Sequence, residues 1–466
     1  MSARAPITQS VASFISGYGP DSLPSEVMAY TRTLVSDGIG VLCAATHESV
    51  TASQGIGGFA EEVAGPGKAT LIGRNRKVDP VSAALANGTL GYAADYEPHH
   101  PEAILHPIAV MIPTALALSE TEGRSGAEAL AAVALGCEIT YRVSMAMNPR
   151  ELYGRGFHPS AIAGSFGAAA ASAYLLGLDS EQTVRALGLA GLQTCGLLAW
   201  QDDPREDARP FQMGLAARNG VMSALLARRG FGAPDRIFDG GHVVLDAYSG
   251  VAVPAKMTDG LGTVWDGVTE LAIKPWASVS FLHPALDALV GLLDEHRIRS
   301  EQIAKISLRF ADSGAHCVDG NPLKGHSAQY ILPVRAAMGR LSFLDLFVDR
   351  RETDPEVARL AANCHVIRDT GEFDAAFPEF YMGEVTLTLT DGRSVSAIGK
   401  VARGYPEEPL SEADLQAKFA DVTSTVCSDS RREALANAAA GLYTAPDVLA
   451  LTGLLSQPPD AKADAA

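Results

Sequence analysis

The sequence has little of several features that would assign a protein to a class at once. Only six of its 466 residues are cysteine, and none of them forms a C-x-x-C pair. This scarcity excludes a disulfide scaffold and fits a reducing cytoplasm, where we expect the protein to reside. Cys43, Cys137 and Cys195 stand in apolar surroundings and are predicted to be buried.

Long apolar runs and leader signals are lacking as well. No stretch reaches about 18 uninterrupted apolar residues, so we predict no membrane span and no membrane partner. The first residues do not show the charged-then-apolar pattern of a signal peptide, which agrees with the expected cytoplasmic location.

Positive charge is scarce too. Lys and Arg number 37 against 54 Asp and Glu, which gives a net charge of −17, and there is no basic run. Because binding to nucleic acid phosphates needs clustered Lys and Arg, we expect no nucleic acid partner. A small anionic substrate is still compatible with this composition, since a few local cations override the overall field.

The common catalytic motifs are missing. There is no P-loop, no G-x-S-x-G and no H-E-x-x-H, and Gly55-Ile-Gly57-Gly58 is only a fragment of a dinucleotide fingerprint without a preceding strand. These absences argue against a nucleotide-dependent enzyme and against a serine hydrolase.

The chain is rich in apolar segments with helical spacing. They dominate it up to about residue 265, and their abundance of Ala and Gly favours helices packed closely together. Gly177 is placed to end one helix, and Asp179-Ser-Glu-Gln182 to cap the next. We predict an all-helical domain over residues 1–268. Its predicted helices cover 24–45, 80–94, 107–119, 127–147, 161–176, 180–190 and 213–228.

The pattern changes between about residues 266 and 404. Ile306–Phe310 alternates apolar and polar residues as a half-buried strand does. Two further alternating runs flank Asp391-Gly392, a pair that suits a type I′ hairpin turn. The predicted strands of this hairpin cover 385–389 and 393–397, and helical stretches cover 284–294, 329–337 and 354–362.

We therefore predict a mainly α fold, in which a smaller α+β lid domain over 269–404 is inserted into the helical domain. The helical domain resumes over 405–466, starting at the capping box Ser411-Glu-Ala-Asp414. The tail from Gln457 is low in apolar residues and is expected to be disordered.

Three His-Pro pairs, at His106, His158 and His283, each stand directly before an apolar helical run. Because Pro favours the first helical position, each His is predicted to lie at or near a helix N-cap. The helix dipole there disfavours imidazolium and attracts an anion, so a neutral imidazole could act as general base beside a bound carboxylate. The plainer alternative, which is commoner for any one of them, is a helix cap.

The loop from Asp95 to His106 offers donors for a metal ion, since Glu97, His99 and His100 lie between them. The spacing matches no standard ligand pattern, and a solvated loop is commoner. We therefore predict no metal site.

Two cations are candidates for binding a substrate. Arg209 ends the charged loop 202–210 and is able to hold a carboxylate through two hydrogen bonds, although surface ion pairs are the usual role of such loops. Lys274 falls at the junction of the two predicted domains, where it is either a cation for the substrate or a surface residue.

Taken in order, several stretches of the chain resemble the MmgE/PrpD family. No single motif decides, but the ordered set is specific and the family covers nearly the whole chain. The resemblance implies a large helical domain with an α+β lid, a cleft between them, a homodimer, and no organic cofactor. The matching stretches are 86–95, 106–107, 154–160, 186–191, 209–217, 273–276 and 326–330.

The family's active-site positions fall on six residues of this chain: Asp95, His106, His158, Arg209, Lys274 and Tyr330. The resemblance implies catalytic roles for His158, Tyr330, His106 and Lys274. It also covers Asp95 and Arg209, and we predict that these two bind the substrate together with His99, Arg155 and Gln212.

The chain departs from the family at a few of these positions. Family dehydratases and decarboxylases typically carry Asp-x-Asp-Asp-Thr where this chain has Asp95-Tyr-Glu-Pro-His99, and one extra residue separates Asp95 from His106. They often have Lys in place of Arg209 and His in place of Gln212. Groups that could protonate a leaving hydroxide are thus altered, whereas the groups that abstract a proton and bind carboxylates are kept.

These departures favour an epimerase that needs no cofactor and acts on a small dicarboxylate, with iminodisuccinate epimerase as the expected activity. One group removes a proton from the carbon next to a carboxylate, and a facing group returns it. We expect His158 to be one of them, with Tyr330 or His106 as the other, while Lys274 and Arg209 hold carboxylates and stabilise the developing charge.

Three alternatives stay open. Within the family, the chain is a lyase of the 2-methylcitrate dehydratase or cis-aconitate decarboxylase type. The second alternative is a metal-dependent hydro-lyase that uses the cluster between Asp95 and His106. The third is a non-catalytic binding protein. In each case the expected partner is a small anionic di- or tricarboxylate.

Overall fold

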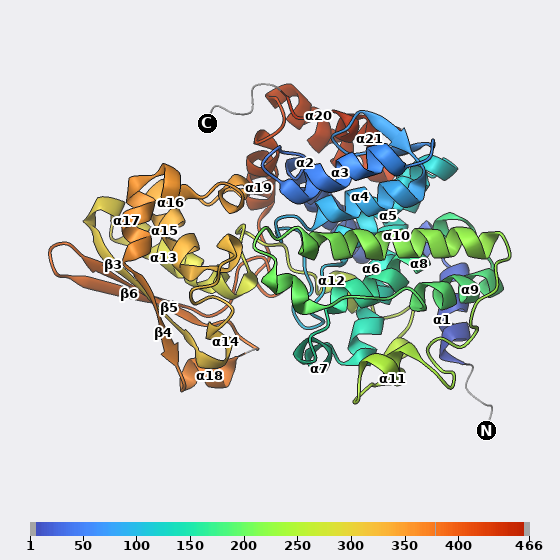
Figure 1. Ribbon diagram of the computed structural model, residues 1–466, viewed down its shortest axis with the longest axis horizontal. Helices are drawn as coiled ribbons and strands as arrows, with labels where there is room; N and C mark the ends of the chain where they lie inside the picture. The colour runs from blue at the N-terminus through green and yellow to red at the C-terminus, as the bar shows by residue number, and fades with distance from the viewer. Residues whose placement is uncertain (1–5, 378, 461–466) are drawn as a thin grey trace. The chain divides into compact units, whose positions relative to one another are not determined.

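The computed structural model describes residues 6–377 and 379–460 (Figure 1). Its contacts divide the chain into two compact units. The helical unit comprises the described residues of 1–93, 97–272 and 423–466. The α+β unit comprises 94–96 and 273–422. The predicted division at 404 differs from this one, because most of the helix that follows, α19 (Glu412–Ser424), clusters with the α+β unit.

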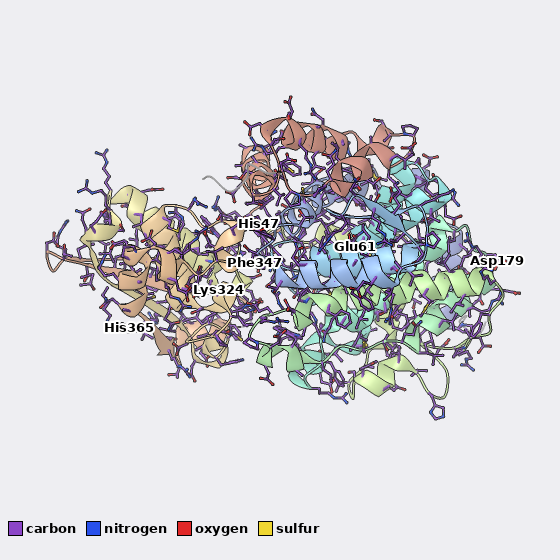
Figure 2. All side chains as sticks on the ribbon, turned by 45° about the horizontal axis from the view of Figure 1, so that its top comes forward. His47, Glu61, Asp179, Lys324, Phe347 and His365 are labelled. Atoms are coloured by element: carbon purple, nitrogen blue, oxygen red, sulfur yellow. The ribbon has the colours of Figure 1, made fainter. Side chains whose placement is uncertain are left out.

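The helical unit is built from helices whose ends carry the expected signals. Asp179, labelled in Figure 2, forms a reciprocal capping box with Gln182 and starts α9. Gly177 adopts a φ of 65° just after α8, as an L-residue rarely does. The helices are α1 Ile7–Ser16, α2 Ser25–Ala44, α3 Thr51–Val63, α4 Pro80–Gly91, α5 Pro107–Glu122, α6 Gly126–Met147, α7 Pro149–Gly154, α8 Pro159–Leu175, α9 Ser180–Gly191, α10 Ala208–Arg228, α11 Val244–Tyr248, α12 Asp266–Thr269, α20 Asp429–Ala440 and α21 Leu449–Ser456.

Small residues let these helices approach closely, as the composition predicts. The helix α10 packs against α4 and α8. A Cβ on Gly220 of α10 would stand 2.3 Å from the Ala168 Cβ of α8, and one on Gly214 would stand 2.3 Å from the Leu85 carbonyl oxygen. The helix α6 is long and apolar enough for a membrane span, but 89% of that apolar window is buried inside the protein, as in a core helix.

Three expectations for the helical unit need correction. It contains one small antiparallel hairpin, β1 (Ala69–Leu71) and β2 (Arg76–Val78), so it is not purely helical. Cys195 is exposed because α9 ends at Gly191 and leaves it in a loop. The start of the predicted disordered tail is bound, since Arg431 donates to the carbonyls of Gln457 and Pro458. The rest of that prediction, 461–466, lies outside the described residues.

The α+β unit contains a four-stranded sheet of order β4-β3-β5-β6. Its strands are β3 Ile303–Ala311, β4 Cys364–Asp369, β5 Gly383–Leu389 and β6 Ser394–Gly399. The β3–β4 pair is parallel and the other two pairs are antiparallel. The helices are α13 His283–Glu295, α14 Asp312–Ala315, α15 Ala328–Met338, α16 Arg350–Thr353, α17 Pro355–Ala362, α18 Glu372–Ala376 and α19.

The predicted hairpin is confirmed as β5–β6, with Val385 paired to Ala397. Its turn differs from the type I′ expected, because only Gly392 of the Asp-Gly pair has a positive φ, 89°. Leu389 and Arg393 close a longer loop that ends in this left-handed glycine, which is the other common way to connect a hairpin. The overall prediction, a mainly helical fold with a smaller α+β part, is confirmed.

Candidate functional site

Two of the three His-Pro histidines occupy helix N-caps, as predicted. His106 is the N-cap of α5 and His158 the N-cap of α8, whereas His283 is the first residue of α13. Neither N-cap imidazole hydrogen-bonds to the first turn of its own helix. These two histidines are therefore caps by position only, and their side chains are directed to other partners.

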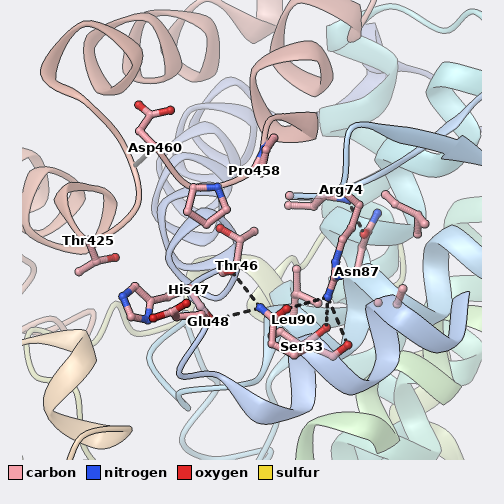
Figure 3. A pocket seen from close by; sticks show the side chains of 17 residues that line it. Thr46, His47, Glu48, Ser53, Arg74, Asn87, Leu90, Thr425, Pro458 and Asp460 are labelled. Carbon is pink, nitrogen blue, oxygen red and sulfur yellow. Dashed lines mark hydrogen bonds between the residues drawn. The ribbon is translucent and has the colours of Figure 1, made fainter. Parts of the chain in front are cut away.

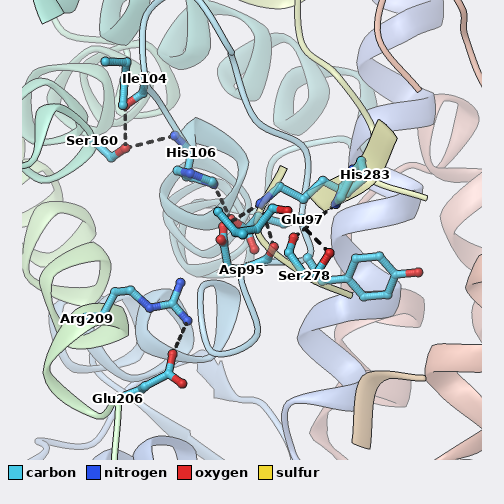
Figure 4. Close-up of polar contacts among 12 residues, drawn as sticks. Asp95, Glu97, Ile104, His106, Ser160, Glu206, Arg209, Ser278 and His283 are labelled. Atoms are coloured by element: carbon cyan, nitrogen blue, oxygen red, sulfur yellow. Dashed lines mark hydrogen bonds and ion pairs between the residues drawn. The ribbon is translucent and has the colours of Figure 1, made fainter. Parts of the chain in front are cut away.

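The His106 imidazole pairs with a buried carboxylate. Its Nδ1 lies 2.8 Å from the Glu97 Oε1, and the side chains are 12% and 1% exposed (Figure 4). The backbone N–H of His106 donates to the Ser160 Oγ at 3.0 Å, which fixes the start of α5 beside the start of α8. The contact between Nδ1 and Glu97 fixes the orientation of the His106 ring.

The His158 imidazole is oriented by an amide. Its Nδ1 lies 3.2 Å from the Gln212 Oε1, and the Gln212 Nε2 donates to the Leu197 carbonyl at 2.8 Å. Because that second bond sets which end of the amide is the oxygen, the His158 Nδ1 carries a hydrogen and donates it to the Gln212 Oε1.

The Tyr92 ring joins these groups into one cluster of the helical unit. Its centroid lies 4.6 Å from that of the His106 ring and 5.9 Å from that of His158. The Arg209 guanidinium carbon sits 4.7 Å over the same ring, and Trp200 borders both His158 and Arg209. Stacking on aromatic faces holds a guanidinium without neutralising it.

Arg209 is buried at the second position of α10, only 2% exposed. Its Nη2 pairs with the Glu206 Oε2 at 3.2 Å (Figure 4). Arg209 therefore does not form an exposed surface ion pair, and its binding of an anion stays a prediction.

Two predicted substrate-binding residues behave differently. His99 pairs through its backbone with Ala272 and stacks on His106 at 5.8 Å, so it borders the cluster. Arg155 is not brought to the cluster: its guanidinium donates to the Tyr248 carbonyl and lies over the Phe157 ring. Arg155 is the exposed C-cap of the short helix α7, which its place in the matching stretch 154–160 did not reveal.

In the α+β unit, Lys274 is buried with its ammonium on Asp95. The Nζ lies 2.7 Å from both the Asp95 Oδ1 and the Asp95 carbonyl oxygen, and the lysine side chain is 1% exposed. The predicted surface alternative for Lys274 is wrong, because the residue is buried. Asp95 has a φ of 53°, in the left-handed region that Asp adopts more often than most L-residues.

His283 lies in the same unit and is fully buried. Its Nε2 lies 3.1 Å from the Ser278 carbonyl oxygen (Figure 4). Burial, with the positive charge of Lys274 next in importance, lowers the pKa of this imidazole to about 3. His283 therefore stays neutral beside the ammonium at physiological pH.

Tyr330 is buried on α15, and its hydroxyl is used within the α+β unit. The oxygen lies 2.6 Å from the Asp345 carbonyl and 3.0 Å from that of Val348, and it accepts from the Arg350 N–H at 3.1 Å. Burial raises the pKa of this phenol well above its usual value. The predicted role of Tyr330 as proton donor requires release from this loop.

A separate hollow of about 360 Å³ lies in the helical unit (Figure 3). His47, Glu48 and Asp460 line one side, and Arg74 and Asn87 the other. Arg74 is committed to α3, because its Nη2 donates to the Gln54 Oε1 and to two carbonyls of that helix. None of the predicted site residues lines this hollow.

Sequence reasoning missed three residues of these clusters. Glu97 was considered only as a metal donor, and its role as partner of His106 depends on a turn that the sequence does not specify. Tyr92 lies inside the matching stretch 86–95, which was a usable signal, whereas Trp200 gave none.

Comparison with known proteins covers the chain almost end to end. Residues 9–255 match the MmgE/PrpD N-terminal domain, and residues 276–442 match the MmgE/PrpD C-terminal domain. The chain is 28% identical to the cis-aconitate decarboxylase-like protein oryM of Aspergillus oryzae, with 97% of each chain covered. It is 28% identical to a cis-aconitate decarboxylase of Aspergillus terreus, over 98% of this chain and 97% of that one. With the cis-aconitate decarboxylase of Homo sapiens it shares 25% identity over 97% and 95% of the two chains.

Proposed function

We propose that this chain, which belongs to the MmgE/PrpD family, is a lyase of the cis-aconitate decarboxylase type that acts on a small di- or tricarboxylate. The departures of the sequence favoured an epimerase, but the named relatives are decarboxylases, so the lyase now comes first. The observation that carries the proposal is the Glu97–His106 pair, a buried carboxylate that orients an imidazole for proton transfer.

In the proposed decarboxylation, residues of the helical cluster bind the substrate and supply a proton. The bond between a carboxylate carbon and its neighbour breaks, CO₂ leaves, and the electron pair remains on the substrate as a delocalised carbanion. His106 in its protonated form donates the proton that completes the new C–H bond, while the Glu97 carboxylate stabilises the positive ring. Arg209 holds a remaining carboxylate, and Lys274 keeps the carboxylate-binding role that the family resemblance implies.

A second candidate, epimerisation, is favoured by one feature of the cluster. Two imidazoles, His106 and His158, flank the same Tyr92 ring, and each is oriented by its own partner through Nδ1. One neutral and one protonated imidazole form the acid and base that removal and return of a proton require. Iminodisuccinate is the substrate that this alternative predicts.

The two reactions are distinguished by incubating the purified enzyme in heavy water with cis-aconitate, methylcitrate and iminodisuccinate, followed by proton NMR and detection of CO₂. A decarboxylase releases one CO₂ per cis-aconitate and places deuterium on the product carbon. An epimerase exchanges the proton of iminodisuccinate without loss of carbon. Absence of both turnover and exchange with all three compounds would contradict the proposal. Formation of an alkene from methylcitrate would show that the enzyme is a dehydratase instead.

Assembly and cofactor use remain predictions of the same resemblance. A homodimer has twice the chain mass of 48.7 kDa, which light scattering measures directly. Activity that persists after exhaustive treatment with a chelator is expected, and its loss with recovery on adding metal would favour the metal-dependent hydro-lyase instead.

A further inference from the structure

The tripeptide 94–96 is held inside the α+β unit, although the residues on either side of it belong to the helical unit. Two buried ammonium groups hold its backbone. The Lys274 Nζ contacts the Asp95 carbonyl at 2.7 Å, and the Lys418 Nζ, which comes from α19, contacts the Tyr96 carbonyl at 2.9 Å. Successive carbonyls of one turn are thus each bound by a lysine from a different part of the chain.

Lys418 is an unusual residue for such a place. It is only 6% exposed, and its Nζ lies 4.1 Å from the centroid of the Tyr96 ring. A lysine is seldom buried unless its charge is bound, and here a carbonyl oxygen and an aromatic face both bind it. The Tyr96 hydroxyl donates in turn to the Pro275 carbonyl at 3.1 Å, one residue after Lys274.

The turn that these contacts hold has a left-handed residue at its centre. Asp95 has a φ of 53°, in a region that Asp and Asn adopt more often than other L-residues except glycine. In this conformation the Asp95 carboxylate lies 2.7 Å from the Lys274 Nζ, and its carbonyl contacts the same ammonium. The position of the Asp95 carboxylate therefore depends on the backbone of the turn, which the contact between Lys418 and the Tyr96 carbonyl also holds.

We propose that Lys418 is a positioning residue: its ammonium, bound to the Tyr96 carbonyl and ring, fixes the turn that sets the geometry of the Asp95–Lys274 ion pair. This inference rests on the proposed function in one respect, namely that Lys274 contacts a substrate carboxylate. Lys418 itself acts through Tyr96 and touches no substrate.

The test uses Lys418→Met, which keeps the length of the side chain but removes the ammonium, and Lys418→Arg, which keeps a buried cation. Lys400→Met is the matched control, because Lys400 is an exposed lysine of the same unit. Circular dichroism and thermal unfolding establish that each variant is folded before it is compared.

The first readout needs no substrate. Hydrogen exchange of the peptide 94–97 in the unliganded protein is expected to be about tenfold faster in Lys418→Met, and close to wild type in Lys418→Arg and Lys400→Met. Wild-type exchange in Lys418→Met overturns the inference. If Lys418→Met does not fold, the same comparison is made with Lys418→Gln.

The second readout is kinetic. A misplaced group that positions the substrate costs up to about 100-fold, so Lys418→Met is expected to lower kcat/KM by roughly 10- to 100-fold per folded molecule. Lys418→Arg keeps the cation and is expected to recover most of that loss. A merely structural role would change the folded fraction and leave kcat/KM per folded molecule unchanged. A wild-type kcat/KM in folded Lys418→Met overturns the inference even if its peptide 94–97 exchanges faster.

Failure of the proposed function gives a different pattern. In that case the wild-type enzyme turns over none of the tested polycarboxylates, and the kinetic comparison has no reference. The exchange experiment then still decides whether Lys418 holds the turn.

Discussion

The two units hold their charged groups in different ways. In the helical unit, His106 and His158 are oriented by side chains, the Glu97 carboxylate and the Gln212 amide. In the α+β unit, the Lys274 ammonium is bound by two oxygens of Asp95, the carboxylate Oδ1 and the backbone carbonyl. The helical unit thus presents two oriented imidazoles, the side-chain type that most often transfers protons, and the α+β unit presents a buried cation. Under the proposed function, the imidazoles move protons and the cation supplies fixed positive charge.

The largest effect is expected from removing that fixed charge. Lys274→Met should lower kcat/KM by about 100- to 1,000-fold, which is the range for losing one preorganised group that stabilises developing charge. It should also destabilise the fold by roughly 3–5 kcal/mol, because the Asp95 carboxylate is left buried without its cation.

The double variant Lys274→Met/Asp95→Asn provides the control for this prediction. It is expected to regain stability in chemical unfolding but not activity, since the uncompensated carboxylate is gone while the cation is still missing. Activity near wild type in either variant would show that the α+β unit does not supply the charge.

The next effect concerns the proton-transfer pair. Glu97→Gln should lower kcat by about 100-fold, the lower part of the range for acid–base catalysis, because an amide cannot stabilise the protonated His106 ring. Glu102→Gln, an exposed position in the same loop, serves as control and should leave kcat unchanged. If kcat is the same in Glu97→Gln and in the control, the Glu97–His106 pair does not carry out the proton transfer.

A smaller effect is expected at Arg209, where family members often have Lys. Arg209→Lys keeps the charge but loses the planar fork and the stacking on Tyr92. We expect KM to rise about tenfold, which corresponds to about 1.4 kcal/mol of binding, with kcat nearly unchanged. A fall in kcat with unchanged KM would instead make Arg209 part of the proton-transfer machinery.

The last effect is on the pH dependence of stability, with none expected on activity at neutral pH, and it arises from His283. Burial lowers its pKa from 6.5 to about 3, so below pH 6.5 the unfolded chain binds a proton that the folded chain does not. Stability therefore falls as pH decreases from about 6.5 toward 3, by at most about 1.4 kcal/mol per pH unit for this group. His283→Gln should flatten that part of the profile in chemical unfolding.

The control for the pH prediction is His365, which is labelled in Figure 2 and lies exposed on β4. His365→Gln should leave the slope between pH 6.5 and pH 3 as in the wild type. If His283→Gln does not change the slope either, other buried groups account for it. His100 is one of these, because burial lowers its pKa to about 4.

Local features of the fold followed from the sequence where the cause lies within a few residues. The capping boxes at Asp179 and Ser411 and the hairpin around Gly392 are set by neighbours in the chain. The His-Pro pairs placed His106 and His158 at helix starts for the same reason. The type of the hairpin turn was not predicted correctly, because it depends on whether the loop has two residues or three.

Partners that are distant in the chain were not predictable in this way. Lys274 and Asp95 are 179 residues apart, and Lys418 and Tyr96 are 322 apart. No periodicity or spacing connects such pairs, and burial of a lysine runs against its usual place at the surface. The family resemblance supplied Lys274, whereas nothing in the sequence indicated Lys418.

The most direct test of the central claim, that proton transfer runs through the imidazole paired with Glu97, is the rate of deuterium incorporation catalysed by His106→Asn in heavy water with the preferred substrate. The account predicts a rate at least about 100-fold below that of the wild-type enzyme, with the affinity for the substrate retained. Incorporation at the wild-type rate would contradict it.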